Sequence, residues 1–201
     1  MSCAIRWWRA SSPPTSSAWL HSRRPLTRRL RCSAPRGASA MLRLSVQRAL
    51  HGEDAPGLPR RPQLLRWCRA AARGDVEVVI RLVGEGEGRA LNRDYRGRDY
   101  ATNVLSFAYD EGEDMPLPPG MPQVGDIVLC VPVIADEAAR QGKSLIDHYA
   151  HLVVHGMLHL QGFDHQTEAD AAGMEALERE ILAGLGIGDP YADTNDGVRG
   201  S

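Results

Sequence analysis

Residues 151–165 read HLVVHGMLHLQGFDH and contain four of the seven histidines of the chain. Positions four apart lie on one face of an α-helix, so the rings of His155 and His159 can converge on one ion. Gly162 is suited to end that helix, because glycine adopts the left-handed conformation of a helix C-terminus at little cost. The turn would bring His165 to the same ion, and we predict a metal site formed by these three histidines.

Three imidazole ligands with a fourth position open to water are typical of a catalytic zinc site, whereas a structural zinc usually has four protein ligands. The alternative is that the histidines are hydrogen-bonded core residues, and the spacing together with the glycine favours the metal. His151 stands one turn before His155, but the helical repeat rotates it away from the side chains of His155 and His159. We therefore expect it to be structural or to support a ligand. The interpretation as core residues is suggested by the apolar neighbours of the histidines, which are Leu152, Val153, Val154, Met157, Leu158 and Leu160.

Length and composition indicate a single domain with flanking tails. The chain has 201 residues, of which 43% are hydrophobic. It contains no apolar run near the roughly 18 residues that cross a bilayer, so we expect no membrane contact. The four cysteines lack a CxxC pair, which indicates reduced thiols and a cytoplasmic location rather than disulfides or a cysteine-zinc site. These cysteines are Cys3, Cys32, Cys68 and Cys130.

The formal net charge of −1 conceals an asymmetry. Residues 1–52 hold 10 arginines and no acid, whereas residues 53–201 hold 14 basic and 25 acidic residues. Residues 1–40 are rich in Arg, Ser and Pro without apolar periodicity, so we predict a disordered extension. It is either a transit-like segment, which would make the location organellar, or the product of a translation start upstream of Met41, and the second interpretation is favoured.

Apolar periodicity and turn residues divide the predicted domain, residues 41–187, into helices and strands. A capping box formed by Ser144 and Asp147 begins the histidine helix. The helix after His165 is amphipathic, with its acids expected on a solvated face, and residues 188–201 are expected to form a flexible tail. The apolar face of this helix comprises Met174, Leu177, Ile181 and Leu182. The other elements are predicted as strands at 42–50, 76–83, 102–109 and 124–131, helices at 63–73 and 134–140, and a short helix or turn at 84–93.

A second informative stretch, residues 91–107, reads LNRDYRGRDYATNVLSF. Its arginines and tyrosines could bind phosphates through guanidinium groups and stack on bases. The alternative is a solvated turn in which the arginines balance Asp94 and Asp99. The residues concerned are Arg89, Arg93, Arg96, Arg98, Tyr95 and Tyr100.

The histidine spacing HxxxHxxGxxH overlaps the metzincin protease pattern HExxHxxGxxH, with one decisive difference. The metzincin glutamate is the general base, and here that position is Gly156. A zinc peptidase would need an acid from elsewhere, such as Asp126, so peptide hydrolysis is disfavoured. Phosphodiester cleavage requires charge stabilisation on phosphoryl oxygens, which a metal and an arginine can supply.

Three blocks of the sequence together resemble the YbeY family of endoribonucleases, also called rRNA maturation factors. The blocks are HGMLHLQGFDH at 155–165, LNRDYRGRDYATNVLSF at 91–107 and VGDIVLC at 124–130. The resemblance covers about residues 41–187. It implies a zincin-like α+β fold in which a small mixed four-stranded sheet packs against about five helices, with one zinc ion held by the three histidines.

The resemblance also implies cleavage of single-stranded RNA, maturation of the 3′ end of small-subunit rRNA and a role in ribosome quality control. The functional arginine of the family falls on Arg96, and Arg98 stands where a lysine is often found. We expect Arg96 to neutralise the scissile phosphate, while Asp164 either orients an imidazole or stabilises the turn. Asn103 and Ser106 are expected to line the pocket. Water and the ribose 2′-hydroxyl both remain candidates for the attacking group.

The acidic balance of the domain predicts weak binding to free RNA, because nucleic-acid affinity depends on phosphate neutralisation. We therefore expect the small ribosomal subunit or a ribosome-associated factor to supply specificity. Two alternatives from other classes are a zinc metallopeptidase and a non-catalytic ribosome-assembly factor with a structural zinc.

Overall fold

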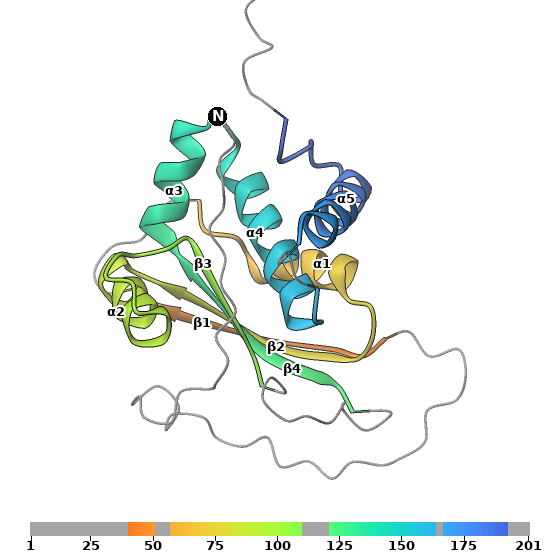
Figure 1. Cartoon of the computed structure of the whole chain (residues 1–201), viewed down its shortest axis with the longest axis horizontal. Coiled ribbons are helices and arrows are strands. Elements are labelled where there is room, and N and C mark those ends of the chain that lie inside the picture. Colours follow the sequence, from red (N-terminus) through yellow and green to blue (C-terminus); the bar gives the residue numbers. More distant parts are fainter. Residues whose placement is uncertain (1–39, 51–56, 110–120, 164–166, 193–201) are drawn as a thin grey trace, which may run out of the picture.

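The computed structural model describes residues 40–50, 57–109, 121–163 and 167–192. Within them the chain forms one mixed four-stranded sheet and five helices, which confirms the predicted α+β class (Figure 1). The strands are β1 (Leu42–Ala49), β2 (Val76–Val83), β3 (Val104–Ala108) and β4 (Gln123–Cys130). The helices are α1 (Arg61–Ala71), α2 (Glu85–Arg96), α3 (Val131–Arg140), α4 (Leu145–Leu160) and α5 (Glu168–Gly184).

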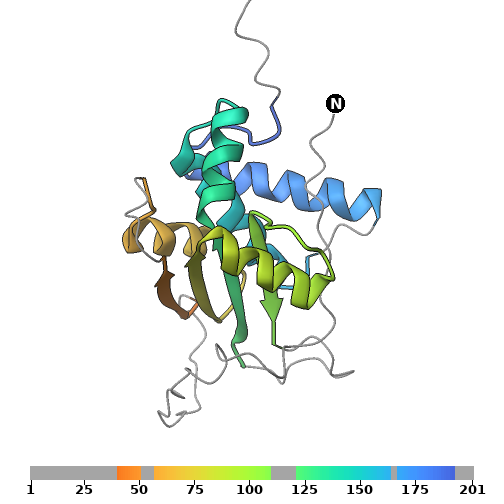
Figure 2. The same cartoon turned by 90° about the vertical axis from the view of Figure 1, so that its left-hand side faces the viewer.

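The sheet has the strand order β1-β2-β4-β3. Strands β1, β2 and β4 run parallel, and the edge strand β3 pairs antiparallel with β4. Helices α1 and α4 pack on one face, and α5 lies on the side of α4 away from the sheet (Figures 1 and 2). Helix α2 covers part of the opposite face, where a smaller apolar cluster includes Leu105, Phe107 and Val128. None of the described helices is long and apolar enough to cross a membrane.

Helix α4 is the most enclosed element, with 12 of its 16 residues buried. Its N-terminus is capped as predicted, because the Ser144 hydroxyl accepts the backbone N–H of Asp147 at 3.5 Å. At its C-terminus Gly162 adopts the predicted left-handed conformation, with φ of +83°. The N–H of Gly162 donates to the carbonyl of His159 and the N–H of Phe163 to that of Leu158, which satisfies two terminal carbonyls.

Three helices begin or extend differently from the prediction. Helices α1 and α3 include a proline in their first turn, where its missing N–H costs no hydrogen bond, so both begin before the predicted positions. Helix α2 runs for 12 residues where the sequence predicted a short helix or turn. One of its glycines has a packing role, since a Cβ on Gly88 would lie 2.9 Å from the Cys130 sulfur. Close contact with β4 therefore compensates for the weak helix propensity of glycine.

Gly156 allows α4 to approach the sheet closely. A Cβ at this position would lie 3.1 Å from Ile127 Cδ1 and 3.2 Å from Ser106 Oγ. The residue that replaces the metzincin glutamate therefore faces strands β3 and β4. A longer side chain at position 156 would point into the protein core and could not reach a solvent-filled site.

We predict that Gly156→Glu destabilises the fold by more than about 3 kcal/mol, because the new side chain would overpack the core and bury a charge. Urea unfolding followed by circular dichroism would measure the change. The matched control is Gly173→Glu on α5, where a Cβ would meet nothing within 4 Å and the residue is exposed. Equal midpoints for the two variants would contradict the proposed packing role.

Candidate metal centre

The rings of His155 and His159 converge on the same point at the end of α4. Their Nε2 atoms lie 2.9 Å apart, with ring centroids 4.5 Å apart and ring planes at 71°. His155 is buried and His159 is partly exposed. Two imidazole nitrogens aimed at each other in this way suit a shared divalent ion, for which both rings must offer a lone pair. The predicted third ligand, His165, and its neighbour Asp164 lie outside the described residues.

Glu178 of α5 is the residue that the sequence analysis missed. Its side chain is fully buried, and its Oε1 lies 2.5 Å from His155 Nδ1. Its Oε2 lies 3.1 Å from His151 Nε2 and also accepts the Tyr191 hydroxyl. The prediction that all acids of this helix are solvated is therefore wrong. The spacing could have indicated this, because positions 174, 178 and 181 share a helix face and Met174 and Ile181 are buried.

His151 is buried one turn before His155 and contacts residues of α5 and of the segment after it. Its ring packs edge-on against Tyr191, with centroids 5.4 Å apart, and its Nε2 lies 3.1 Å from Glu178 Oε2. The potential ligand atoms of His151, His155 and Glu178 all lie within 4.8 Å of one another, so this group could hold a metal ion. The part of the chain that the structure describes thus offers two edges of His155, Nδ1 and Nε2, for an ion.

Hydrogen bonding determines the charge state of this cluster. Burial raises the pKa of Glu178, but hydrogen bonds from His151 and His155 lower it by more, and the net pKa lies well below its usual range. Burial and the adjacent Glu178 carboxylate raise the pKa of Tyr191. Glu178 is therefore ionised near neutral pH and Tyr191 is protonated, so the phenol donates and the carboxylate only accepts.

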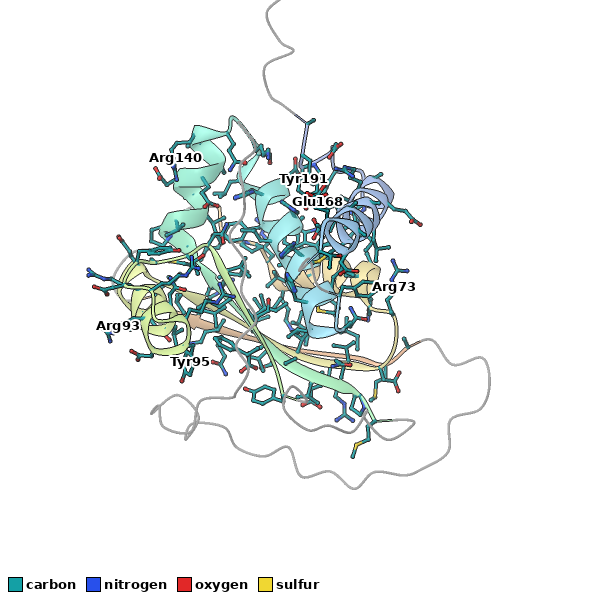
Figure 3. The ribbon with its side chains drawn as sticks, in the orientation of Figure 1. Arg73, Arg93, Tyr95, Arg140, Glu168 and Tyr191 are labelled. Atoms are coloured by element: carbon teal, nitrogen blue, oxygen red, sulfur yellow. The ribbon has the colours of Figure 1, made fainter. Side chains whose placement is uncertain are left out.

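The arginines of the second block divide into two kinds. Arg89 forms a two-point ion pair with Asp99, at 2.8 and 2.6 Å, and Arg93 bonds to Asp94 at 3.1 Å. All four are exposed, and Figure 3 shows Arg93 at the outer rim of α2. The alternative interpretation of a charge-balanced surface therefore describes these two arginines.

Arg96 differs from its neighbours. It is the last residue of α2, is partly buried, and forms no hydrogen bond or ion pair with any described residue. Burial, and then the charge of Arg98, lower the pKa of Arg96 to about 10. Its guanidinium is therefore charged at neutral pH without a carboxylate partner in the described chain, which is an arrangement suited to an anion. Arg98 donates to the Tyr100 hydroxyl at 3.1 Å.

Two residues predicted to line the pocket lie on or beside β3. Asn103 is 7% exposed, and its Nδ2 donates to Glu137 Oε2 at 2.8 Å while its Oδ1 accepts the Val104 N–H at 2.7 Å. Glu137 also contacts His148 Nε2 at 3.1 Å, so Asn103 links β3 to α3 and α4. Ser106 faces Gly156 of α4, and its buried Oγ has no hydrogen-bond partner among the described residues.

Asp126 does not face the histidines. It lies on β4 opposite Val79 and Phe107, on the sheet face away from α4, whereas the adjacent Ile127 packs beneath Gly156. Its Oδ2 accepts the Tyr109 hydroxyl. The hypothesis that Asp126 replaces the metzincin glutamate is therefore wrong, because the sheet separates this carboxylate from the histidine pair.

Comparison with protein families assigns residues 63–186 to the model described as Endoribonuclease YbeY. The chain belongs to the YbeY endoribonuclease family. A member from Azoarcus sp. is 59% identical over 152 residues, which cover 76% of this chain and 60% of the relative. One from Aromatoleum aromaticum is 57% identical over 155 residues, which cover 77% of this chain and 96% of the relative. One from Chromobacterium violaceum is 56% identical over 141 residues, which cover 69% of this chain and 82% of the relative.

The region matched to the YbeY family runs from within α1 to beyond the end of α5 and includes Arg96, both converging histidines and Glu178. Tyr191 lies just beyond it. A solution structure of TM1509 from Thermotoga maritima matches with a TM-score of 0.43 at 24% identity, covering 79% of this chain and 100% of that chain.

We predict that Asn103→Ala lowers the free energy of unfolding by about 1–3 kcal/mol, because the Val104 N–H and the Glu137 carboxylate each lose a buried partner. Thermal unfolding would measure this loss. The control is Asp136→Ala on α3, which removes an exposed i,i+4 pair with Arg140 and should change stability by less than about 0.5 kcal/mol. An Asn103→Ala variant as stable as this control would show that the link between β3 and α3 contributes little.

Proposed function

We propose that this protein is a zinc-dependent endoribonuclease that cleaves single-stranded RNA and acts in maturation of the 3′ end of small-subunit rRNA and in ribosome quality control. The observation that carries the proposal is the 2.9 Å approach of the Nε2 atoms of His155 and His159. Family membership supports the class of reaction. His165 is proposed as the third ligand, and Asp164 as a residue that orients an imidazole.

The residues fit a zinc ion, since nitrogen ligands suit this metal and an ionised carboxylate already supports one of them. Zinc held there supplies Lewis-acid catalysis. Arg96 contributes a guanidinium without a competing carboxylate in the described chain, and we assign it to neutralising charge on the scissile phosphate. Ser106 is kept as a proposed pocket residue on the strength of its place in the sequence block that resembles the family, although its Oγ is buried against Gly156. Asn103 is proposed to hold that pocket wall in place.

Peptide hydrolysis is the less favoured function. Gly156 faces the sheet and carries no proton acceptor, and Asp126 lies on the opposite face. Glu178 is fully buried and occupied by His151 and His155. The described chain thus presents no free carboxylate at the histidine pair that could act as general base for an amide substrate.

We predict that His159→Ala abolishes both zinc binding and RNA cleavage, because it removes one of the two converging nitrogens. Arg96→Ala should retain zinc and lose cleavage by about 100-fold or more, as expected for a group that stabilises transition-state charge. Metal analysis and cleavage of a labelled single-stranded RNA would be measured on the same preparations. The matched control is Arg93→Ala, whose exposed side chain is already paired with Asp94 and should be dispensable. Cleavage by a zinc-free His159→Ala protein would contradict the proposal.

The charge distribution supports a ribosomal partner. Residues 53–201 carry 11 more acidic than basic residues, and Arg89 and Arg93 are paired with carboxylates. Residues 53–201 therefore carry a net negative charge, and naked RNA should bind weakly. We propose that a small ribosomal subunit in the cytoplasm, or a factor bound to it, positions the RNA.

We predict that cleavage near the 3′ end of small-subunit rRNA is at least tenfold more efficient on subunit particles than on the same naked RNA, because the particle supplies the missing binding energy. Rates would be compared at matched ionic strength and RNA concentration. Equal rates on both substrates would remove the requirement for a ribosomal partner and leave the nuclease activity itself unaffected.

A further inference from the structure

We propose that Glu178 is a positioning residue of the metal centre: its carboxylate accepts the Nδ1–H of His155, which directs the Nε2 lone pair of that ring at the ion, and Tyr191 holds the carboxylate in place. This inference rests on the proposed function, because it assigns the ion to the Nε2 edge of His155. It gives a role to α5 and to the segment after it, neither of which contributes a residue to the converging histidine pair.

The geometry of the carboxylate supports this role. A buried charge is costly unless several donors surround it, and Glu178 has three, from His155, His151 and Tyr191. Its Oε1 lies 2.5 Å from His155 Nδ1, a hydrogen-bond distance. A carboxylate oxygen at this distance can accept the Nδ1–H, so we place the ring proton of His155 on Nδ1. The opposite nitrogen, Nε2, then carries the lone pair, and it is the atom that faces His159.

The alternative is that the ion lies between His151, His155 and Glu178, whose ligand atoms are within 4.8 Å of one another. Both carboxylate oxygens are already engaged by ring nitrogens, and all three residues are buried. An ion there would displace the Nδ1 proton of His155 and would be closed off from a substrate. His159, by contrast, is partly exposed, so the Nε2 edge is the one that a phosphate can approach.

The segment after α5 fixes Tyr191 over this network. The Lys143 ammonium donates to the Pro190 carbonyl at 2.6 Å, and Arg179 pairs with Asp189 at 3.4 Å. The Arg179 guanidinium also lies 4.9 Å from the centre of the Tyr191 ring. Residues 189–191, which the sequence placed in a flexible tail, therefore contact α5 and the loop before α4. Tyr191 contacts both α4, through His151, and α5, through Glu178 (Figure 3).

The test measures zinc affinity by competition with a chromophoric chelator. Glu178→Gln keeps the size of the side chain but leaves only one oxygen that can accept hydrogen bonds, in place of the two carboxylate oxygens. We expect zinc affinity to fall about 10- to 100-fold, the usual effect of losing a partner of a metal-bound histidine. The visible spectrum of the cobalt-substituted protein should change as well. Glu180→Gln, an exposed position on the same helix, is the matched control and should keep wild-type affinity and spectrum.

Two further measurements test the inference if the Glu178→Gln protein fails to fold. Tyr191→Phe removes only the phenolic donor and should weaken zinc binding less than Glu178→Gln. In the metal-free wild type, ¹⁵N NMR of the imidazoles should place the His155 proton on Nδ1. A proton on Nε2 would overturn the inference, as would wild-type affinity and an unchanged cobalt spectrum in folded Glu178→Gln.

The variants also distinguish the failure of this inference from failure of the proposed function. A wild-type protein that binds no zinc would contradict the proposed function and the inference together. A wild type that binds zinc, with Glu178→Gln equal to it, would overturn the inference alone. If zinc binding were lost in His151→Asn and retained in His159→Ala, Glu178 would be a ligand in the buried group, and its assignment as a positioning residue would be wrong.

Discussion

The structure depends on the need to satisfy polar groups on a buried helix. Helix α4 is enclosed by the sheet, α1, α3 and α5, yet one side of it carries His148, His151, His155 and His159. An imidazole in such surroundings is stable only with hydrogen-bond partners. They come from other helices: Glu137 of α3 contacts His148, and Glu178 of α5 contacts His151 and His155. His159 and His155 face each other.

This requirement links the candidate metal site to the fold. The carboxylates that stabilise the histidines also hold α3 and α5 against α4, so the same contacts serve packing and chemistry. Removing one partner of a buried charged pair leaves the other uncompensated, and the cost exceeds that of losing a surface ion pair. The exposed pairs Arg89–Asp99 and Arg93–Asp94 are of the second kind and contribute little to stability. The contacts of α4 with α3 and α5 are therefore the ones on which both the site and the fold depend.

Local sequence determined those parts of the structure that depend on nearby residues. Strand β2 has the predicted bounds, and Ser144 and Gly162 mark the two ends of α4 because capping and left-handed turns are local properties. Contacts between distant residues were harder to predict. Glu178 lies 23 residues after His155, and only its position on the face of Met174 and Ile181 indicated burial. The length of α2 was underestimated, because its glycines oppose a helix until the contact with Cys130 is known.

The packing of α4 also bears on where the proposed charge-stabilising group of this protein lies. A helix that carries both metal-binding histidines and a general base needs an accessible face for the base. Here the position after the first histidine is Gly156, and the space that a side chain would fill is occupied by Ile127 and Ser106. A general base at position 156 is therefore ruled out by packing. Arg96, at the end of α2 and without a carboxylate partner among the described residues, has the charge that a phosphodiester requires. Close packing at Gly156 thus agrees with the proposed reaction, which uses a cation from another element and no base at position 156.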